Sequence, residues 1–327
     1  MIKKYLDRLL QGYNLEYEEA FELATATPAP MLFQAADELR RRLHHDSFDL
    51  CSIINARSGK CTEDCKFCAQ SACYETAIET YELVDSATAV AQALENEAHG
   101  VRRFSLVTAG RTVSDRQLTR FGEIYRQLRA DTGLALCASM GFLTAEKARR
   151  LKEMGVVRYH CNLEASSSFF PQVCSTHSWQ EKVATLKIAR EAGLELCSGG
   201  IIGMGENLRQ RLELAFELRE LGVLSIPLNI LTPIPNTPFA DLKPLNLDEV
   251  LTCVAMFRLI NPKAIIRMAG GRMLLSEEQY RCFTSGANGA IVGNYLTTAG
   301  NTLEEDLQML RALGFTFNAP GDKDNGR

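Results

Sequence analysis

A repeated β–α pattern from Phe48 onward constrains the fold of this 327-residue chain more than any other feature. Each repeat consists of a short β-type run, a polar loop, an amphipathic helix and a glycine where the helix ends. The β-type runs are Phe48–Ile54, Arg103–Thr108, Ala135–Ala138, Val157–Asn162, Glu195–Gly199, Ser225–Leu231, Ala264–Met268 and Ala290–Val292. Strands that alternate with helices form parallel sheets, and eight such units close into a barrel. The pattern therefore predicts an α/β fold of the (β/α)8 TIM-type barrel class, with a six-stranded partial barrel as the alternative.

Residues that begin and end helices support these boundaries. Four pairs have, or resemble, the spacing of a capping box: Ser178 with Glu181, Ser276 with Gln279, Thr302 with Glu305, and Asn246 with Glu249. Six glycines stand where glycine terminates a helix: Gly100, Gly155, Gly193, Gly222, Gly286 and Gly314.

The N-terminal region stands apart from the repeat. Residues before Asp46 predict two helices, which Pro28 and Pro30 separate, and Pro30 suits the first turn of the second helix. No linker divides the repeats, and the end of the chain is rich in glycine, aspartate and asparagine. We therefore expect a short N-terminal helical extension at 1–46, one barrel at 47–314 and a flexible C-terminal tail at 315–327.

Composition excludes several kinds of partner. The formal net charge of −4 does not favour nucleic acid or an anionic membrane. The opening MIKKYLDRLL is broken by charges, unlike a signal peptide, and no apolar run is long enough to span a bilayer. Eleven cysteines without an export signal favour a cytoplasmic protein whose thiolates bind metal. Cys51, Cys253 and Cys282 lie in apolar patterns, and we interpret them as small buried hydrophobic residues.

Three cysteines share the loop after the first predicted strand, SGKCTEDCKFCAQSACY. Cys61, Cys65 and Cys68 have Cys-x3-Cys-x2-Cys spacing, and barrel chemistry sits on loops at the carboxyl ends of strands. Three thiolates can hold three corners of a [4Fe-4S] cluster and leave the fourth iron open to S-adenosylmethionine (SAM), which an electron then cleaves to a 5′-deoxyadenosyl radical. A structural zinc site is the alternative; zinc takes four ligands, and the fourth would have to be Cys73.

The motif and the predicted barrel resemble the radical SAM superfamily. The resemblance implies a barrel of the radical SAM kind, with Cys61, Cys65 and Cys68 as catalytic ligands of the SAM-cleaving cluster. In that superfamily the aromatic residue before the last cysteine, here Phe67, stacks near the adenine of SAM.

Four more cysteines fall on or after later strands. Cys137 lies in the third strand, Cys161 in the fourth with Cys174 after it, and Cys197 ends the fifth. Adjacent strands of a barrel face one lumen, so thiolates from these strands can share one iron site without a local motif.

Several segments resemble biotin synthase, over about Phe48 to Leu313. The most specific are the motif loop followed by AQS, then CSGGIIGMGE, SIPLNIL, IRMAGGR and GANGAIVGNYLTT. The resemblance implies insertion of sulfur into dethiobiotin to form biotin. It also implies a second, auxiliary iron–sulfur cluster deep in the barrel as the source of sulfur.

The ligands of this auxiliary cluster depart from the family pattern. Well-known members use three strand cysteines and an arginine, and two of these cysteines map onto Cys137 and Cys197, and the arginine onto Arg267. The third cysteine maps onto Ser105, which is a poor iron ligand beside thiolate. Cys161 and Cys174 stand where relatives have histidine and a residue other than cysteine. We therefore expect a rebuilt site with Cys161, Cys174 or both added, which suits a four-iron cluster at least as well as a [2Fe-2S] cluster. Strand alternation leaves Cys161 open as a core thiol instead.

The resemblance also assigns binding residues one by one. Asn162 contacts SAM or substrate, Glu164 binds the ribose hydroxyls of SAM, and Asn229 bridges cofactor and substrate. Thr297 and Thr298 match a pair that binds the carboxylate end of the substrate, with helix capping as the alternative. His160 replaces a family asparagine, and its role is open.

Three functions compete. Sulfur insertion, with a flavodoxin- or ferredoxin-type electron donor and a homodimer, is what the biotin synthase resemblance implies. Biotin-synthase-like mutases and maturases share the barrel and first motif, and the missing strand-two cysteine favours them. A non-enzymatic iron–sulfur or zinc module is the third, although three ligands with an open site argue against it.

Overall fold

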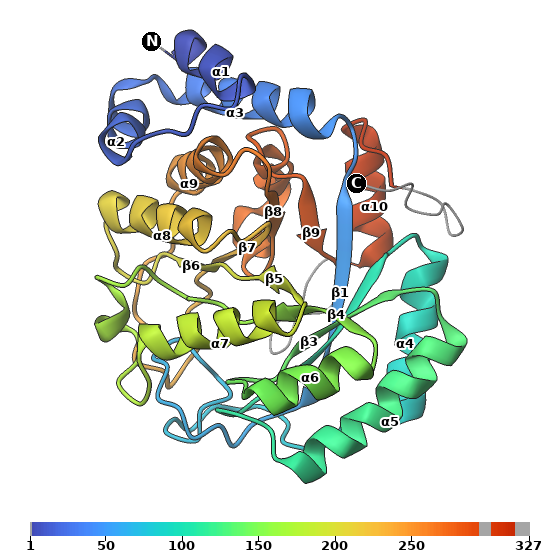
Figure 1. Cartoon of the computed structure of the whole chain (residues 1–327). Coiled ribbons are helices and arrows are strands. Elements are labelled where there is room, and N and C mark those ends of the chain that lie inside the picture. Colours follow the sequence, from blue (N-terminus) through green and yellow to red (C-terminus); the bar gives the residue numbers. More distant parts are fainter. Residues whose placement is uncertain (1, 294–301, 318–327) are drawn as a thin grey trace.

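The computed structural model describes residues 2–293 and 302–317, which form a closed parallel barrel covered by helices (Figure 1). Its strands are β1 (Asp49–Arg57), β2 (Arg103–Thr108), β3 (Ala135–Ser139), β4 (Val156–His160), β5 (Glu195–Cys197), β6 (Gly200–Ile202), β7 (Ser225–Ile230), β8 (Ile265–Met268) and β9 (Gly289–Ile291). They pair in the order β5-β4-β3-β2-β1-β9-β8-β7-β6, and β5 closes the barrel on β7. Since β5 and β6 are two parts of one barrel strand, the (β/α)8 prediction is confirmed.

The break between β5 and β6 is where the fifth predicted strand differs from the structure. A Cβ atom on Gly199 would lie 1.9 Å from the carbonyl oxygen of Pro227, and one on Gly200 would lie 2.5 Å from that of Glu164. The backbone of this strand therefore passes too close to its neighbours for any side chain. The two glycines are needed to close the barrel at this seam.

The helices that follow the strands are α4 (Ser86–Ala98), α5 (Asp115–Asp131), α6 (Ala145–Glu153), α7 (Trp179–Glu191), α8 (Leu208–Glu220), α9 (Leu247–Ile260) and α10 (Leu303–Ala312), with 3₁₀ turns η1 (Phe170–Gln172) and η2 (Arg272–Cys282). The capping boxes at Ser178, Asn246 and Thr302 are confirmed. The one at Ser276 is wrong: Ser276 lies inside η2 with φ 48°, and Gln279 accepts a hydrogen bond from Arg272 instead.

The N-terminal region contains three helices rather than two: α1 (Ile2–Leu10), α2 (Tyr17–Ala26) and α3 (Ala29–His44). Gly12, with φ 90°, ends the first, and a capping box between Glu16 and Glu19 begins the second. These helices lie at the end of the barrel opposite the loop after β1, and α3 packs along α9 (Figure 1).

The end of the described chain returns to the same region. Phe315 is buried against Phe48, and Thr316 pairs with Ser47 just before β1. The packed part of the chain therefore extends to Thr316 at least.

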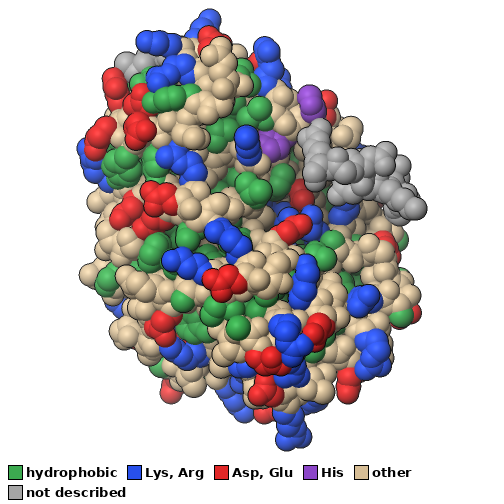
Figure 2. Space-filling view, viewed as in Figure 1, with side chains coloured by type: hydrophobic (Ala, Val, Ile, Leu, Met, Phe, Trp, Pro, Cys, Tyr) green, Lys and Arg blue, Asp and Glu red, His purple; other side chains and the backbone are tan. Residues whose placement is uncertain are grey.

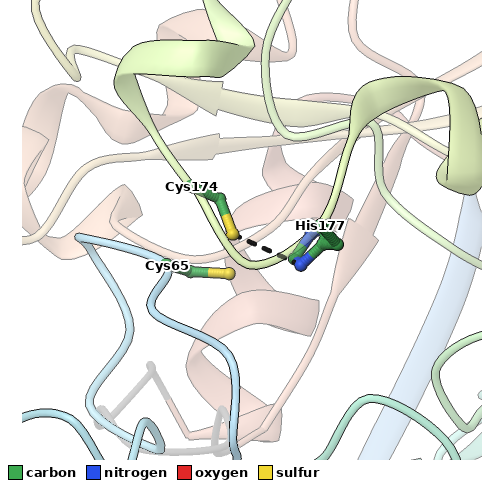
Figure 3. Close-up of side chains that lie close together, drawn as sticks. All are labelled: Cys65, Cys174 and His177. Atoms are coloured by element: carbon green, nitrogen blue, oxygen red, sulfur yellow. Dashed lines mark hydrogen bonds between the residues drawn. The ribbon is translucent and has the colours of Figure 1, made fainter.

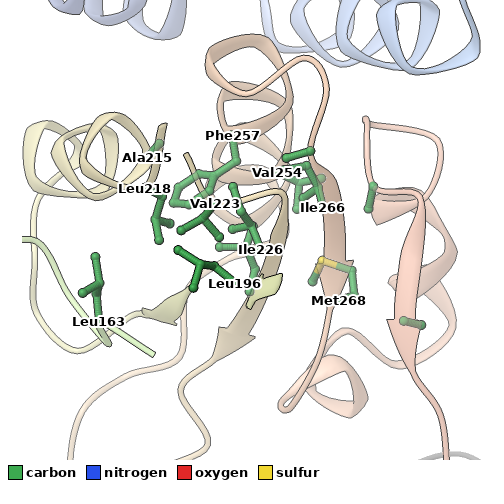
Figure 4. Packing of buried hydrophobic residues seen from close by; sticks show 14 of the residues in the cluster. Leu163, Leu196, Ala215, Leu218, Val223, Ile226, Val254, Phe257, Ile266 and Met268 are labelled. Atoms are coloured by element: carbon green, nitrogen blue, oxygen red, sulfur yellow. The ribbon is translucent and has the colours of Figure 1, made fainter. Parts of the chain in front are cut away.

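The main hydrophobic core lies between the strands and the surrounding helices. Figure 4 shows one sector, in which Ile226 and Ile266 of the sheet meet Leu218 of α8 and Phe257 of α9. All four side chains are completely buried. Because these outward-facing residues anchor the helices, the inward-facing residues of the same strands are left for the site.

The surface carries charges of both signs. On the face seen in Figure 2, basic and acidic side chains are interspersed without a broad area of one sign. Among the described residues, no helix has the length and apolar character needed to cross a membrane.

The seam at Gly199 can be tested directly. We expect Gly199→Ala to lower the melting temperature of the cluster-free protein strongly, because the added methyl group collides with backbone. Gly314→Ala is the matched control: Gly314 has φ 82° but no atom within 4 Å of an added Cβ, so only the left-handed penalty of about 1 kcal/mol applies. Equal effects of the two substitutions would contradict this account of the seam.

Candidate active site

One cavity of about 420 Å³ opens at the carboxyl ends of the strands and extends into the barrel. Its mouth is formed by the loop after β1, which carries Cys61, Cys65 and Cys68. Deeper, it is lined by inward-facing side chains that include Cys137, Cys197 and Arg267. The barrel therefore brings most of the sequence-predicted residues of both clusters, although not Cys174, to one continuous space.

The loop of the first motif is held by its own backbone. The Cys61 N–H donates to the Gln70 carbonyl, the Ala72 N–H donates to the Cys61 carbonyl, and the Cys68 N–H donates to the Cys65 carbonyl. These hydrogen bonds fold the loop back on itself and direct all three thiols toward the cavity. The sulfur atoms are not all within 4.8 Å of one another, whereas ligands of one tetrahedral zinc ion lie about 3.8 Å apart. The spacing suits a multi-iron cluster better than zinc.

Cys174 lies beside this loop, and the structure does not bring it to Cys137 and Cys197. Its sulfur, the sulfur of Cys65 and a ring nitrogen of His177 are mutually within 4.8 Å (Figure 3). The Cys174 thiol also donates to the Asp64 carboxylate at 3.1 Å. The segment after β4 bends over the mouth of the barrel instead of descending into it. The structure thus places Cys174 beside the first cluster loop, and its part in the auxiliary cluster stays a prediction.

Cys161 comes directly after β4, and its N–H donates to the Cys197 carbonyl at 3.1 Å. It borders the cavity but packs within the main hydrophobic core. Burial raises the pKa of the Cys161 thiol, and the charged groups acting on it are Lys182 and Glu164. This placement matches the core-thiol alternative that strand alternation had left open.

Cys137 and Cys197 lie deep in the lumen, 4% and 9% exposed. Cys51 of β1 lines the same part of the cavity, although the sequence analysis had treated it as a core residue. The alternation of the strand could have predicted this, because Cys51 shares the inward face with Asp49 and Ile53. The apolar residues around Cys51 favoured the core interpretation instead.

Two polar groups mark this deep region as a binding site. The Ser105 hydroxyl is buried next to Cys137 in the β2–β3 register and has no hydrogen-bond partner among the residues that the structure describes. A buried hydroxyl without a partner is costly and indicates a bound group. Arg267 is 2% exposed, and its guanidinium donates to the Asp49 carboxylate at 2.6 Å. The cysteines, the serine and the adjacent cation fit an anionic iron–sulfur cluster.

A chain of hydrogen bonds runs along β4 and the residues after it. His160 Nε2 lies 2.8 Å from Asn162 Oδ1, and this oxygen also accepts from the Gly199 N–H. Because an amide oxygen can only accept, Nε2 is the donor. Asn162 Nδ2 in turn donates to Glu164 at 3.2 Å. Burial lowers the pKa of His160 to about 4, so the ring is neutral at pH 7 and its other nitrogen accepts from Ser139. His160 therefore orients Asn162.

Glu164 itself has an unusual backbone. Its φ is 70°, a left-handed conformation that costs about 1 kcal/mol in a residue other than glycine. Two backbone hydrogen bonds hold Glu164 in this conformation. Its N–H donates to the Gly199 carbonyl, and its carbonyl accepts from the Ile201 N–H. Such strain is typical of residues at functional sites. Burial raises the pKa of the Glu164 carboxyl.

Phe67 and Asn229 lie on the cavity wall, as the sequence analysis expected of residues near SAM. Phe67 packs against a small apolar cluster formed by Ala165, Phe169, Val173, Met204 and Leu231. The Asn229 amide donates to the Gly200 carbonyl and accepts from the Gly270 N–H, which joins the start of β6 to the loop after β8. Thr297 and Thr298 lie outside the described residues.

Lys182 of α7 is a further cavity residue that the sequence analysis missed. It is 8% exposed, and within the described chain its ammonium group has no hydrogen-bond or ion-pair partner. Burial by itself would lower the pKa of Lys182. The nearby Cys161 and Glu164 raise this pKa by more, so the net shift is upward. A buried cation that faces a cavity without a counter-ion suits an anionic group of a ligand.

Comparison with known proteins shows the family to which this chain belongs. A protein named biotin synthase from Desulfotalea psychrophila is 56% identical over 98% of this chain and 96% of its own length. Another, from Acetivibrio thermocellus, is 49% identical over 94% of this chain and 97% of its own. The chain belongs to the biotin synthase family. The radical SAM superfamily profile matches residues 56–218, and the biotin and thiamin synthesis associated domain matches residues 227–316. This membership implies a [4Fe-4S] cluster and SAM.

Solved structures of lower identity share the fold. A methylornithine synthase superposes with a TM-score of 0.84 at 16% identity, covering 97% of this chain and 98% of that one. An FeFe-hydrogenase maturase from Carboxydothermus hydrogenoformans superposes with a TM-score of 0.80 at 18% identity, covering 97% and 79%. These similarities concern the radical SAM barrel alone.

The loop geometry predicts separate effects for its cysteines. We expect Cys61→Ala, Cys65→Ala and Cys68→Ala each to abolish SAM cleavage, because a lost ligand also removes the order that the cluster imposes on the loop. Cys174→Ala should retain the deep cluster, since its sulfur lies beside Cys65. Iron content and 5′-deoxyadenosine formation under anaerobic conditions measure both effects. Normal cleavage by any of the first three variants would refute the ligand assignment.

Proposed function

We propose that this protein inserts sulfur into dethiobiotin and so forms biotin. The observation that carries the proposal is a single cavity with SAM-cluster cysteines at its mouth and further thiols in its depth. The full-length similarity to proteins named biotin synthase supports the same reaction. A substrate between the two sets of thiols would have a radical source on one side and a sulfur source on the other.

SAM binds at the mouth in this proposal. Cys61, Cys65 and Cys68 hold the [4Fe-4S] cluster, which supplies the electron for SAM cleavage when bound. Phe67 offers an aromatic face to the adenine, and Glu164 offers a two-acceptor carboxylate to the ribose hydroxyls. Lys182 contributes the positive charge that the α-carboxylate of SAM requires.

The substrate binds between Asn162, Asn229 and the pair Thr297 and Thr298. Asn162 is held by His160 and Gly199, and Asn229 by Gly200 and Gly270, so both amides are positioned before substrate arrives. Preorganised side chains of this kind lower the cost of orienting a small substrate. The apolar Ile53 and Val107 on the same cavity wall suit an aliphatic chain.

The auxiliary cluster lies in the lumen, on Cys137 and Cys197, with Arg267 beside it. With serine at Ser105 the family's ligand set is incomplete, and a site rebuilt with other thiolates would suit a four-iron cluster at least as well as [2Fe-2S]. A flavodoxin- or ferredoxin-type protein supplies electrons, and the enzyme works as a homodimer in the cytoplasm, as the family resemblance implies. The odd number of cysteines agrees with a reducing compartment.

A mutase or maturase without sulfur insertion is the alternative, and two observations oppose it. The solved mutase- and maturase-type structures are under 20% identical, whereas the named biotin synthases reach 43–56%. The deep thiols are retained beside an unpartnered Ser105 hydroxyl.

The reaction is tested by supplying dethiobiotin, SAM and a reductant under strict anaerobiosis and detecting biotin by mass spectrometry. We expect biotin to form with two SAM consumed per product, one for each C–H bond broken. If dethiobiotin neither binds nor stimulates SAM cleavage, the mutase alternative replaces this proposal.

The role of Lys182 gives a binding prediction. We expect Lys182→Met to weaken SAM binding by roughly tenfold or more, because a charge-assisted hydrogen bond contributes about 1.5–3 kcal/mol. Lys182→Arg should retain most of the affinity. Equilibrium dialysis with cluster-loaded protein measures both, and iron content shows that each variant still holds its clusters. Unchanged affinity in the methionine variant would exclude this role.

A further inference from the structure

The auxiliary cluster of the proposed function lacks a third thiolate once Cys174 and Cys161 are removed from it. Cys174 lies with Cys65 and His177 at the mouth, and Cys161 lies in the core near Lys182. Ser105, at the position of the family's strand-two cysteine, has only a hydroxyl. Two cysteines and an arginine would then have to hold the whole cluster.

Arg267 is poorly suited to bind iron in this chain. Its guanidinium donates to the Asp49 carboxylate at 2.6 Å, to the Asp49 carbonyl at 3.0 Å and to the Ala290 carbonyl at 3.2 Å. Arginine stays protonated in proteins, so this guanidinium is charged. A charged guanidinium has no lone pair to offer a metal.

Cys51 is placed to supply the missing third thiolate. It lies on β1, adjacent to β2, and its side chain lines the cavity together with those of Cys137 and Cys197. Within the described part of the chain, its sulfur makes one weak contact, 3.8 Å from the Ser52 carbonyl, and no strong hydrogen bond there competes with a ligand.

The three thiols border one cavity from three different strands, because Cys51 lies on β1, Cys137 on β3 and Cys197 at the end of β5. The three sulfurs are not all within 4.8 Å of one another, which is too open for one tetrahedral ion and suits the corners of a cluster.

We propose that Cys51, Cys137 and Cys197 are the three thiolate ligands of the auxiliary cluster, and that Arg267 is a positioning cation beside it. The inference rests on the proposed function, because it assumes a cluster in the lumen. Ser105, whose hydroxyl has no partner, then donates a hydrogen bond to the cluster instead of binding iron. Three thiolates would leave one corner of a four-iron cluster without a protein ligand.

The test isolates the deep cluster by removing the other. A background variant with Cys61→Ala, Cys65→Ala and Cys68→Ala is reconstituted anaerobically with ⁵⁷Fe and sulfide, and its iron, sulfide and Mössbauer spectrum are measured. Cys51→Ala and Cys51→Ser are then added separately to this background. We expect both to lose most of the remaining iron, while Cys161→Ala and the core variant Cys253→Ala keep it.

The serine variant guards against loss of fold, because it changes one atom at nearly constant volume, and melting temperatures are compared throughout. Retention of iron with an unchanged spectrum in the Cys51 variants would overturn this ligand assignment while leaving sulfur insertion intact. Equal loss in Cys161→Ala would also overturn it, because the loss would then reflect the fold. A background variant that holds no iron would overturn the lumen cluster itself, and with it the proposed function.

Discussion

The closure of one parallel sheet is the constraint on which the rest of this structure depends. The seam between β5 and β7 pairs Cys197 with Ser225, and it forms only because Gly199 allows the backbone to pass the Pro227 carbonyl. Side chains alternate along each strand, so closure turns one set outward to the helices and the other into a shared lumen. Cysteines far apart in the sequence therefore become neighbours without any local motif.

The lumen also has to accommodate charge away from water. Asp49 is paired with Arg267 at 2.6 Å and lies 3.6 Å from Arg103, and Arg158 pairs with Glu195 at 2.7 Å. Burying Arg267 and Arg158 is costly unless they are paired and hydrogen-bonded, whereas the Glu195 side chain is 54% exposed. The arrangement leaves a net positive surrounding for thiolates, which is the environment that an anionic cluster needs.

At the mouth, a second polar network joins the cluster loop to the start of α7. The Asp64 carboxylate accepts from the Ser175 and Thr176 N–H groups, and Glu63 contacts both His177 and Arg111. Burial disfavours the charged form of Asp64, but the hydrogen bonds from Ser175 and Cys174 outweigh it and lower its pKa. The loop that carries the first cluster is thus positioned by residues about 110 positions later in the chain.

The sequence by itself determined the barrel, its eight strands and the first cluster motif, because strand alternation, capping residues and short spacings are local properties. It also placed Asn162, Glu164 and Asn229 on the cavity. The third N-terminal helix was missed because one glycine, Gly12, ends a helix without a proline to mark it. Only the tertiary structure decided which cysteines meet. Cys174 turns over the mouth and Cys51 turns inward, because the direction of a loop and the twist of a closed sheet depend on contacts between residues far apart in the sequence.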